Sequence, residues 1–303
     1  MNKTFLLVAG LALVACQPAT EETAGEPATP ETAETPAESD SSEKLAALLD
    51  AQPDEVKARY AHRHPQETLE FFGIEPGMTV LEGLPGRGWY SKVLLQYLGS
   101  DGCLIGADYS LEMYPNFFFA TEEFMARQSQ FVERFPADAA EWGGENGAAA
   151  RAFHFGSMPD EIVGTADIAF FPRVLHNLAR FESEGKGDYL TAALADTYRA
   201  LKPGGIFGVV QHLARDDMPD EWAYGANGYL KRQFIIDRVE AAGFEFVSES
   251  DINANPDDQP TVDDFVWRLP PTYATSEGDE EVRAKMDAIG ESNRITLKFR
   301  KPR

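Results

Sequence analysis

One stretch of the chain, residues 76 to 108, constrains the fold more than any other, and it reads PGMTVLEGLPGRGWYSKVLLQYLGSDGCLIGAD. An apolar run, Thr79 to Leu81, ends at the acidic Glu82, and a glycine-rich turn follows it. A helix-like segment from Trp89 to Leu98 comes next, and a second apolar run ends at Asp108. The order strand, glycine turn, helix, strand, acid predicts the first half of a nucleotide-binding βαβ unit.

The glycine-rich turn contains Gly83, Gly86 and Gly88. Glycine accepts positive φ angles and lets the backbone approach a ligand closely, and the free N–H groups at the start of the next helix favour an anion. Asp108 follows Gly88 at the spacing of about 20 residues that places an acid beside ribose hydroxyls. A glycine turn alone is also consistent with an ordinary bend, so the acid at this distance decides the prediction.

A second stretch, Tyr198 to His212, reads YRALKPGGIFGVVQH and combines a helix end, a Pro-Gly-Gly turn and a buried-type strand. This turn and the first stretch resemble the corresponding parts of class I S-adenosylmethionine (SAM)-dependent methyltransferases. Segments that resemble that family's fourth strand, the loop after it, the helix end before strand six and the closing strand are ADIAFF (166–171), RVLHNL (173–178), AAGF (241–244) and RITLKFRKP (294–302). The resemblance covers roughly residues 55 to 303.

The loop PGRGWY, the segment NPDD and the terminal FRKP resemble a bacterial subgroup of predicted exported methyltransferases. The resemblance implies a Rossmann-like α/β fold with a doubly wound, seven-stranded sheet, mostly parallel, whose last strand is antiparallel. Alternating helical and buried-strand patterns support the same fold class. The implied cofactor is SAM, and the residues expected to bind it are Glu82, Gly83, Gly86, Gly88, Trp89, Asp108, Tyr109, Ser157 and Met158.

The family resemblance assigns these residues to parts of the cofactor. Glu82 and the glycines would border the methionine and the ribose, and Asp108 would bind the ribose hydroxyls. Trp89 and Tyr109 would shape the loop and flank adenine, which residues 157 and 158 would border at the end of the third predicted strand.

One position departs from the family's motif. The first glycine of the motif is replaced by Leu84, and the next residue, Pro85, has no N–H to offer a ligand. A leucine at this position is expected to crowd or shift the methionine part of SAM. The adenosine half of the site is expected to be intact.

Two histidines are candidate general bases. His176 lies in the loop after the fourth predicted strand, which would face the transferred methyl group, and imidazole can take a proton near neutral pH. In the alternative, His176 only hydrogen-bonds the backbone and fixes the loop. His212, just past the fifth strand, is the weaker candidate. Residues 213 to 233 form an insertion that is predicted to recognise the substrate. On the predicted helix 55–72, His62 and His64 are either substrate-facing or part of a solvated face.

The first sixteen residues have the pattern of a targeting segment. Residues 5 to 14 form a short apolar core after Lys3, and the box LVAC ends at Cys16. This resembles a bacterial lipoprotein signal that is cut before Cys16 and lipidated there, and a plain secretory signal is the alternative. Gln17 in place of Asp implies the outer membrane of a two-membrane cell, with the protein facing the periplasm.

Composition divides the rest of the chain in two. Residues 17 to 42 are mostly Glu, Thr, Ala and Pro and cannot bury enough apolar surface to fold, so they predict a disordered acidic tether. Residues 43 to 303 are predicted to form the methyltransferase-like domain. No spacing typical of a metal site occurs in the sequence.

The net charge of -23 argues against nucleic acid as a partner, because its phosphates would be repelled. It also argues against adsorption to anionic lipid, so the lipid anchor alone would hold the protein at the membrane. The expected ligand is a small molecule, and protein partners stay open. Two functions remain: a SAM-dependent methyltransferase, or a non-catalytic ligand-binding lipoprotein on the same fold. Two features favour the second function: SAM is made in the cytoplasm, away from the compartment of an exported protein, and Leu84 replaces a glycine of the motif.

Overall fold

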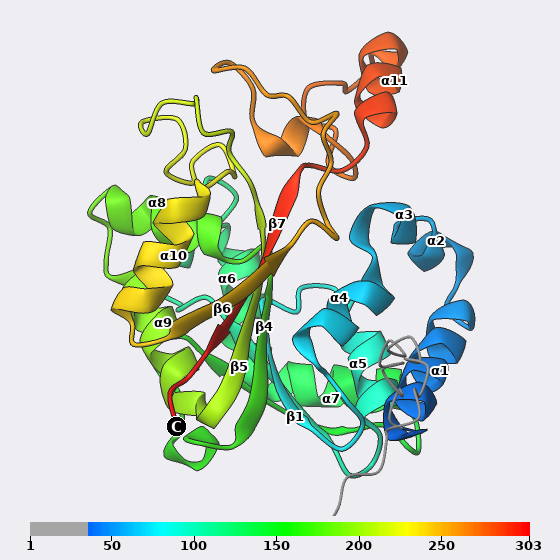
Figure 1. The fold of residues 1–303 in the computed structure, drawn as a ribbon. Helices are drawn as coiled ribbons and strands as arrows, with labels where there is room; N and C mark the ends of the chain where they lie inside the picture. Colours follow the sequence, from blue (N-terminus) through cyan, green and yellow to red (C-terminus); the bar gives the residue numbers. More distant parts are fainter. Residues whose placement is uncertain (1–35) are drawn as a thin grey trace, which may run out of the picture. The chain divides into compact units, whose positions relative to one another are not determined.

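The computed structural model describes residues 36–303, which form one unit around a seven-stranded sheet (Figure 1). The strands are β1 (Thr79–Gly83), β2 (Cys103–Asp108), β3 (Ala149–His154), β4 (Ala166–Pro172), β5 (Leu201–His212), β6 (Glu245–Ser250) and β7 (Arg294–Arg300). Their order across the sheet is β3-β2-β1-β4-β5-β7-β6. Strands β1 to β5 pair in parallel, and β7 is antiparallel to both of its neighbours, β5 and β6.

Helices cover both faces of this sheet (Figure 1). On one face lie α1 (Pro36–Asp50), α4 (Pro65–Phe72), α5 (Ser91–Leu98) and α7 (Phe131–Gly143). On the other lie α8 (Leu175–Ser183), α9 (Tyr189–Ala200) and α10 (Arg232–Ala241). Shorter helices are α2 (Asp54–Lys57), α3 (Tyr60–Arg63), α6 (Glu122–Ser129) and α11 (Glu280–Ile289). The predicted doubly wound, mostly parallel sheet with an antiparallel last strand is confirmed.

The alternation of side chains along the strands explains why an apolar core lies on each face of the sheet. Successive side chains of a strand point to opposite faces. Val80 packs with α4 and α5, whereas Leu81 packs with α8 and α9; Phe170 and Phe171 divide between the same two faces. Because the central strands are buried on both sides, they read as continuous apolar runs in the sequence.

One predicted helix is broken in the structure, and an aromatic segment between β2 and β3 is divided among short elements. The helix expected over residues 55–72 is divided into α2, α3 and α4, and the break between α3 and α4 lies at His64, which adopts a left-handed φ of 39° before Pro65. A residue before proline is disfavoured in the right-handed helical region. The aromatic segment 111–135 forms a 3₁₀ turn at Tyr114–Asn116, then α6, and only its last residues enter α7.

Helix α1 begins at Pro36, so residues 36 to 42, which we predicted within the tether, are helical. The signal segment, Cys16 and residues 17 to 35 of the predicted tether lie outside the described residues. Between residues 36 and 303, no helix is long and apolar enough to cross a membrane.

Candidate cofactor and substrate site

The carboxyl ends of the parallel strands meet at one edge of the sheet, and residues predicted at the cofactor lie there. Glu82 lies beside Gly106 of β2 and Phe170 of β4. Asp108 pairs with His154 of β3. In Figure 1 this edge is the upper end of the sheet, below the loops that follow β5 and β6. Ligands of open α/β sheets bind at such an edge.

Glu82 lies near the end of β1 and is almost fully buried. Its Oε2 accepts a hydrogen bond of 2.6 Å from Ser91 Oγ, at the start of α5. Burial raises the pKa of Glu82 to about 7, and the Ser91 hydroxyl and Arg173 offset only part of that rise. The carboxyl is therefore about half protonated at neutral pH, and a cation bound beside it would favour the charged form.

Replacing Glu82 with Gln is expected to stabilise the protein in mild alkali and to change little in acid. A carboxyl whose pKa rises from 4.5 to about 7 on folding adds stability below pH 4.5 that is lost as the pH rises through 7. The amide keeps an acceptor for Ser91 and removes this loss, a gain of about 2–3 kcal/mol at about pH 8. Urea unfolding of both proteins at about pH 5 and about pH 8 measures it. An equal difference at both pH values would contradict the prediction.

The three glycines of the loop have different neighbours. A Cβ on Gly83 would lie 2.7 Å from the Phe171 ring, and one on Gly88 would lie 2.6 Å from the Trp142 ring. Both residues must therefore be glycine for the loop to pack against β4 and α7. Gly86 is exposed, has a φ of 60°, and would bring a Cβ near only a loop carbonyl oxygen, at 3.8 Å. Gly86 is thus the glycine at which the backbone is open to a ligand.

Leu84 adopts the left-handed conformation usually reserved for glycine. Its φ is 52°, in a region that disfavours a side chain by about 1 kcal/mol. The Leu84 N–H donates to the Ala107 carbonyl oxygen at 2.7 Å, which holds the loop against β2. Its half-buried side chain packs against the core on the α8 face of the sheet. The backbone here is glycine-like, and the side chain adds apolar bulk.

Asp108 ends β2 and is buried, and both of its carboxylate oxygens accept hydrogen bonds from the protein. Oδ1 accepts from the Tyr114 hydroxyl at 2.6 Å and from the Tyr109 N–H at 2.8 Å. Oδ2 accepts from Gln128 Nε2 at 3.1 Å. Burial raises the pKa of Asp108, and the hydrogen bonds lower it in part. A ribose diol would have to replace the hydrogen bond of Tyr114 or of Gln128.

A cavity of about 460 Å³ lies at the ends of β2 and β3, and we call it the β2–β3 cavity; Ser110, His154 and Ser157 are in its wall, with parts of α8 and α9. Two buried wall atoms, Ser110 Oγ and His154 Nε2, have no hydrogen-bond partner among residues 36–303. His154 Nδ1 lies 2.8 Å from the Tyr109 carbonyl oxygen and so carries the proton, leaving Nε2 as an acceptor. Buried polar atoms without partners indicate a place for a polar ligand.

The other predicted cofactor residues divide between two places. Ser157, which we predicted beside adenine, is exposed in the wall of the β2–β3 cavity. Met158 is not in that wall; it is buried in the core, where its apolar side chain packs. Tyr109 is buried beside Asp108. Trp89 lies away from the cavity, with the Arg63 guanidinium over its ring at 4.5 Å.

The two histidine candidates lie together over β4 and β5, with ring centroids 5.4 Å apart. Burial lowers the pKa of His176 to about 4 and also lowers that of His212 well below its usual range. The His176 ring lies between the amides of Gln211 and Asn177, and His212 Nδ1 is 2.6 Å from Ser292 Oγ. Both rings are neutral and weakly basic at pH 7, which favours the alternative in which His176 fixes the loop.

Two aromatic residues of the insertion 213–233, which we predicted to recognise the substrate, are buried and are therefore not available to a ligand. Trp222 and Tyr229 stack in a small core of their own, with centroids 5.2 Å apart. The Tyr229 hydroxyl donates to Asp258 at 2.8 Å. The insertion is thus held to the segment before β7.

A second cavity, of about 220 Å³, lies over the ends of β4 and β5, and it was not predicted from the sequence. We call it the arginine pocket, and its wall includes Arg59, Arg63, Arg173, His212, Trp267 and Glu291. Arg173 opens the loop RVLHNL and Arg63 stands between two histidines that we considered, so the signal was present. The residues come from separate segments that only the fold brings together.

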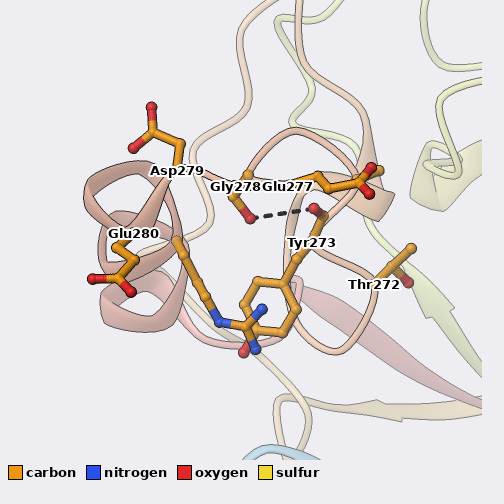
Figure 2. A pocket seen from close by; sticks show the side chains of 9 residues that line it. Thr272, Tyr273, Glu277, Gly278, Asp279 and Glu280 are labelled. Carbon is orange, nitrogen blue, oxygen red and sulfur yellow. Dashed lines mark hydrogen bonds between the residues drawn. The ribbon is translucent and has the colours of Figure 1, made fainter.

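A third hollow, of about 500 Å³, lies beside α11 and is drawn in Figure 2. Its wall comes from the single segment 272–283, and Arg283 lies 3.9 Å from the Tyr273 ring centroid there. The hollow is a surface feature of this segment and does not include the strand ends. Among the residues that the structure describes, no group of three or more His, Cys, Asp or Glu side chains could hold a metal ion.

No family model matches the chain, and no curated protein matches its sequence. Similar solved structures include a SAM-dependent methyltransferase from Aquifex aeolicus, with 16% identity, a TM-score of 0.48, and coverage of 86% of this chain and 97% of that one. The cyclase SpnF has 18% identity, a TM-score of 0.48, and coverage of 80% and 82%. A geranyl diphosphate C-methyltransferase from Streptomyces coelicolor A3(2), in complex with Mg²⁺, geranyl diphosphate and S-adenosyl-L-homocysteine, has 15% identity, a TM-score of 0.46, and coverage of 88% and 98%. At such values the function has to be argued from the site.

Proposed function

We propose that the protein is a SAM-dependent methyltransferase acting on a small molecule. One observation carries the proposal: the strand order β3-β2-β1-β4-β5-β7-β6 places the glycine loop, Glu82 and Asp108 at the same sheet edge. This is the place and the residue set from which open α/β sheets bind nucleoside-type ligands. The unpaired Ser110 Oγ and His154 Nε2 beside Asp108 fit the polar edge of an adenine ring.

The residues divide the binding of SAM as follows. Asp108 would take the ribose hydroxyls, and Gly86 would let the loop backbone approach the ligand. Ser110 and His154 would meet adenine in the β2–β3 cavity. Glu82 would favour a cationic group, because a nearby positive charge lowers its raised pKa.

Bound SAM would supply an electrophilic methyl group on a sulfonium. The protein's part is to hold an acceptor in line with that group, and such positioning alone can lower a barrier by several kcal/mol. Since His176 and His212 are weak bases at pH 7, the site favours an acceptor that reacts without losing a proton to a histidine.

Replacing Asp108 with Asn should weaken SAM binding about tenfold to a hundredfold. A hydrogen bond to a charged acceptor contributes about 1.5–3 kcal/mol, and the amide retains an acceptor for Tyr114. Calorimetry of the full chain with SAM and with S-adenosylhomocysteine measures the affinities. Replacing Asp101, exposed at the opposite end of β2, with Asn is the matched control and should change nothing. No binding of either compound by the unmodified protein at millimolar concentration would overturn the proposal.

Two observations favour the alternative, a non-catalytic binding protein on this fold. Leu84 adds apolar bulk at the glycine position, and the Asp108 carboxylate already accepts hydrogen bonds from Tyr114 and Gln128. The two functions separate in the same calorimetry: an adenosine-type ligand that binds independently of Asp108 would support the alternative.

We also propose, from the sequence, that the protein is exported, lipidated at Cys16 and anchored in the outer membrane facing the periplasm. The box LVAC and Gln17 support this. Fractionation of the producing cells tests it, and recovery of the protein in the cytoplasm would contradict it. A methyltransferase in that compartment would need a supply of SAM there.

A further inference from the structure

The arginine pocket brings several positive charges together in a strongly acidic protein. The chain has 27 basic and 50 acidic residues, yet three arginines share one small cavity wall with a single carboxylate. That carboxylate, Glu291, is bonded to Arg59 at 2.6 Å and to Arg63 at 3.3 Å. It also pairs with the buried Arg294 at 3.2 Å, just outside the wall. Glu291 is thus shared by three cations.

Arg173 is close enough to Glu291 to affect its pKa but forms no ion pair with it. Among residues 36–303, its guanidinium has no hydrogen-bond or ion-pair partner, although the residue is only partly exposed and lines the pocket. Its φ of 66° is a left-handed conformation that is uncommon outside glycine. The Arg173 N–H donates to the Val210 carbonyl oxygen at 2.6 Å, which fixes the residue at the end of β4. Strain of this kind is found most often at binding sites.

The pocket wall therefore has a surplus of two positive charges over Glu291. His212 does not change this, because burial lowers its pKa and keeps the ring neutral. Burial and the neighbouring guanidinium groups also lower the pKa of Arg63, although an arginine side chain stays protonated. An oxyanion would relieve the repulsion and take the free donors of Arg173.

We propose that the arginine pocket binds a small organic oxyanion, a carboxylate or phosphate on an apolar body, and that this anion is the methyl acceptor. Val266, Trp267 and Pro270 line the pocket beside the arginines and would contact the apolar body. A volume of about 220 Å³ suits a ligand the size of one ring with its charged group. The binding claim stands on the pocket, and the role as acceptor rests on the proposed function.

The same oxyanion chemistry could come from the carboxylate of SAM. The pocket wall contains no residue of the glycine loop and not Asp108. It lies instead over β4 and β5, with Arg173 and His212 at the ends of those strands. This placement favours a second ligand over the carboxylate of the cofactor. Competition between the small anion and S-adenosylhomocysteine distinguishes the two possibilities.

Calorimetric titration of the full chain with benzoate, phenyl phosphate and inorganic phosphate tests the proposal. We expect the two aromatic anions to bind more tightly than inorganic phosphate, and to bind equally well with S-adenosylhomocysteine present in saturating amount. Arg173→Gln should weaken binding at least about tenfold, as expected for a lost charge-assisted hydrogen bond. Arg173→Lys keeps the charge but loses the bidentate donor, so its affinity should lie between those of the unmodified protein and Arg173→Gln.

The matched control is Arg199→Gln, which makes the same change in net charge at a half-exposed site on α9. If Arg173→Gln fails to fold, Arg59→Gln at the same pocket takes its place. Binding unchanged by the pocket variants, or no binding of any of the three anions at millimolar concentration, overturns the proposal. Displacement of benzoate by S-adenosylhomocysteine would assign the pocket to the cofactor instead. Anion binding without SAM binding would leave the pocket standing and refute the methyltransferase.

Discussion

Replacing Glu291 with Gln should lower the free energy of unfolding by about 3–5 kcal/mol at pH 7, because it removes the carboxylate that Arg59, Arg63 and Arg294 share. Burial alone would raise the pKa of Glu291, but the surrounding arginines lower it to about 2. A carboxyl with a lowered pKa adds stability above its unfolded value of 4.5 that is lost as the pH falls through 2. The loss should therefore shrink in strong acid.

Urea unfolding as a function of pH measures the effect of Glu291→Gln. The control is Glu281→Gln, which breaks an exposed pair with Lys285 at 2.9 Å and should cost less than about 0.5 kcal/mol. The pH dependence of Glu291→Gln has the opposite sign to that of Glu82→Gln. Glu291→Gln therefore reports on stability in acid, and Glu82→Gln reports on stability near neutral pH. A Glu291 variant as stable as the control would show that the arginines do not depend on this carboxylate. Added phosphate should restore part of the lost stability if the pocket binds anions.

Gly225→Ala should destabilise the protein by about 3 kcal/mol or more. A Cβ at this position would lie 2.1 Å from the His176 carbonyl oxygen and 3.2 Å from the Arg180 nitrogen, and the φ is 107°. Both neighbours are backbone atoms of α8, so no side chain can move aside. The insertion 213–233 would have to separate from α8, which would expose its small core around Trp222.

The matched control is Gly185→Ala, because this glycine has a φ of 70° and nothing within 4 Å of a Cβ. It isolates the backbone term, about 1–2 kcal/mol. Denaturant unfolding gives the stability of both variants, and hydrogen exchange of residues 213–233 shows whether the insertion separates. Similar losses for the two variants would mean that the contact of Gly225 with α8 is not essential.

The sheet could be predicted from the sequence because its signals are local. Apolar runs that end at Glu82 and Asp108 each indicate a strand boundary within a few residues, whereas the Pro-Gly-Gly sequence that we placed before the fifth strand lies inside the first half of β5. The helix over 55–72 was not predicted correctly, because the effect of Pro65 on His64 divides a continuous apolar pattern. The other boundaries of helices and strands depend on contacts between residues that are distant in the sequence.

The site could be predicted only where it lies along one segment. Glu82, Gly86 and Asp108 belong to a single strand-turn-helix-strand unit, so their spacing reveals them. The arginine pocket draws Arg63 from before β1 and Glu291 from before β7. Nothing in the sequence near either residue indicates the other. The burial that lowers the pKa of the histidines was likewise invisible before the fold was known.

The position of β7 sets the order in which the molecule can assemble. This strand is the last in the chain, yet it lies between β5 and β6, and β6 has no other strand partner in the sheet. While the chain is being synthesised, β6 cannot pair until Arg294–Arg300 has emerged, and such long-range pairing is slow. Glu291, three residues earlier, arrives at the same moment. Until then Arg59 and Arg63 lack their carboxylate, so the arginine pocket cannot form before the last strand does.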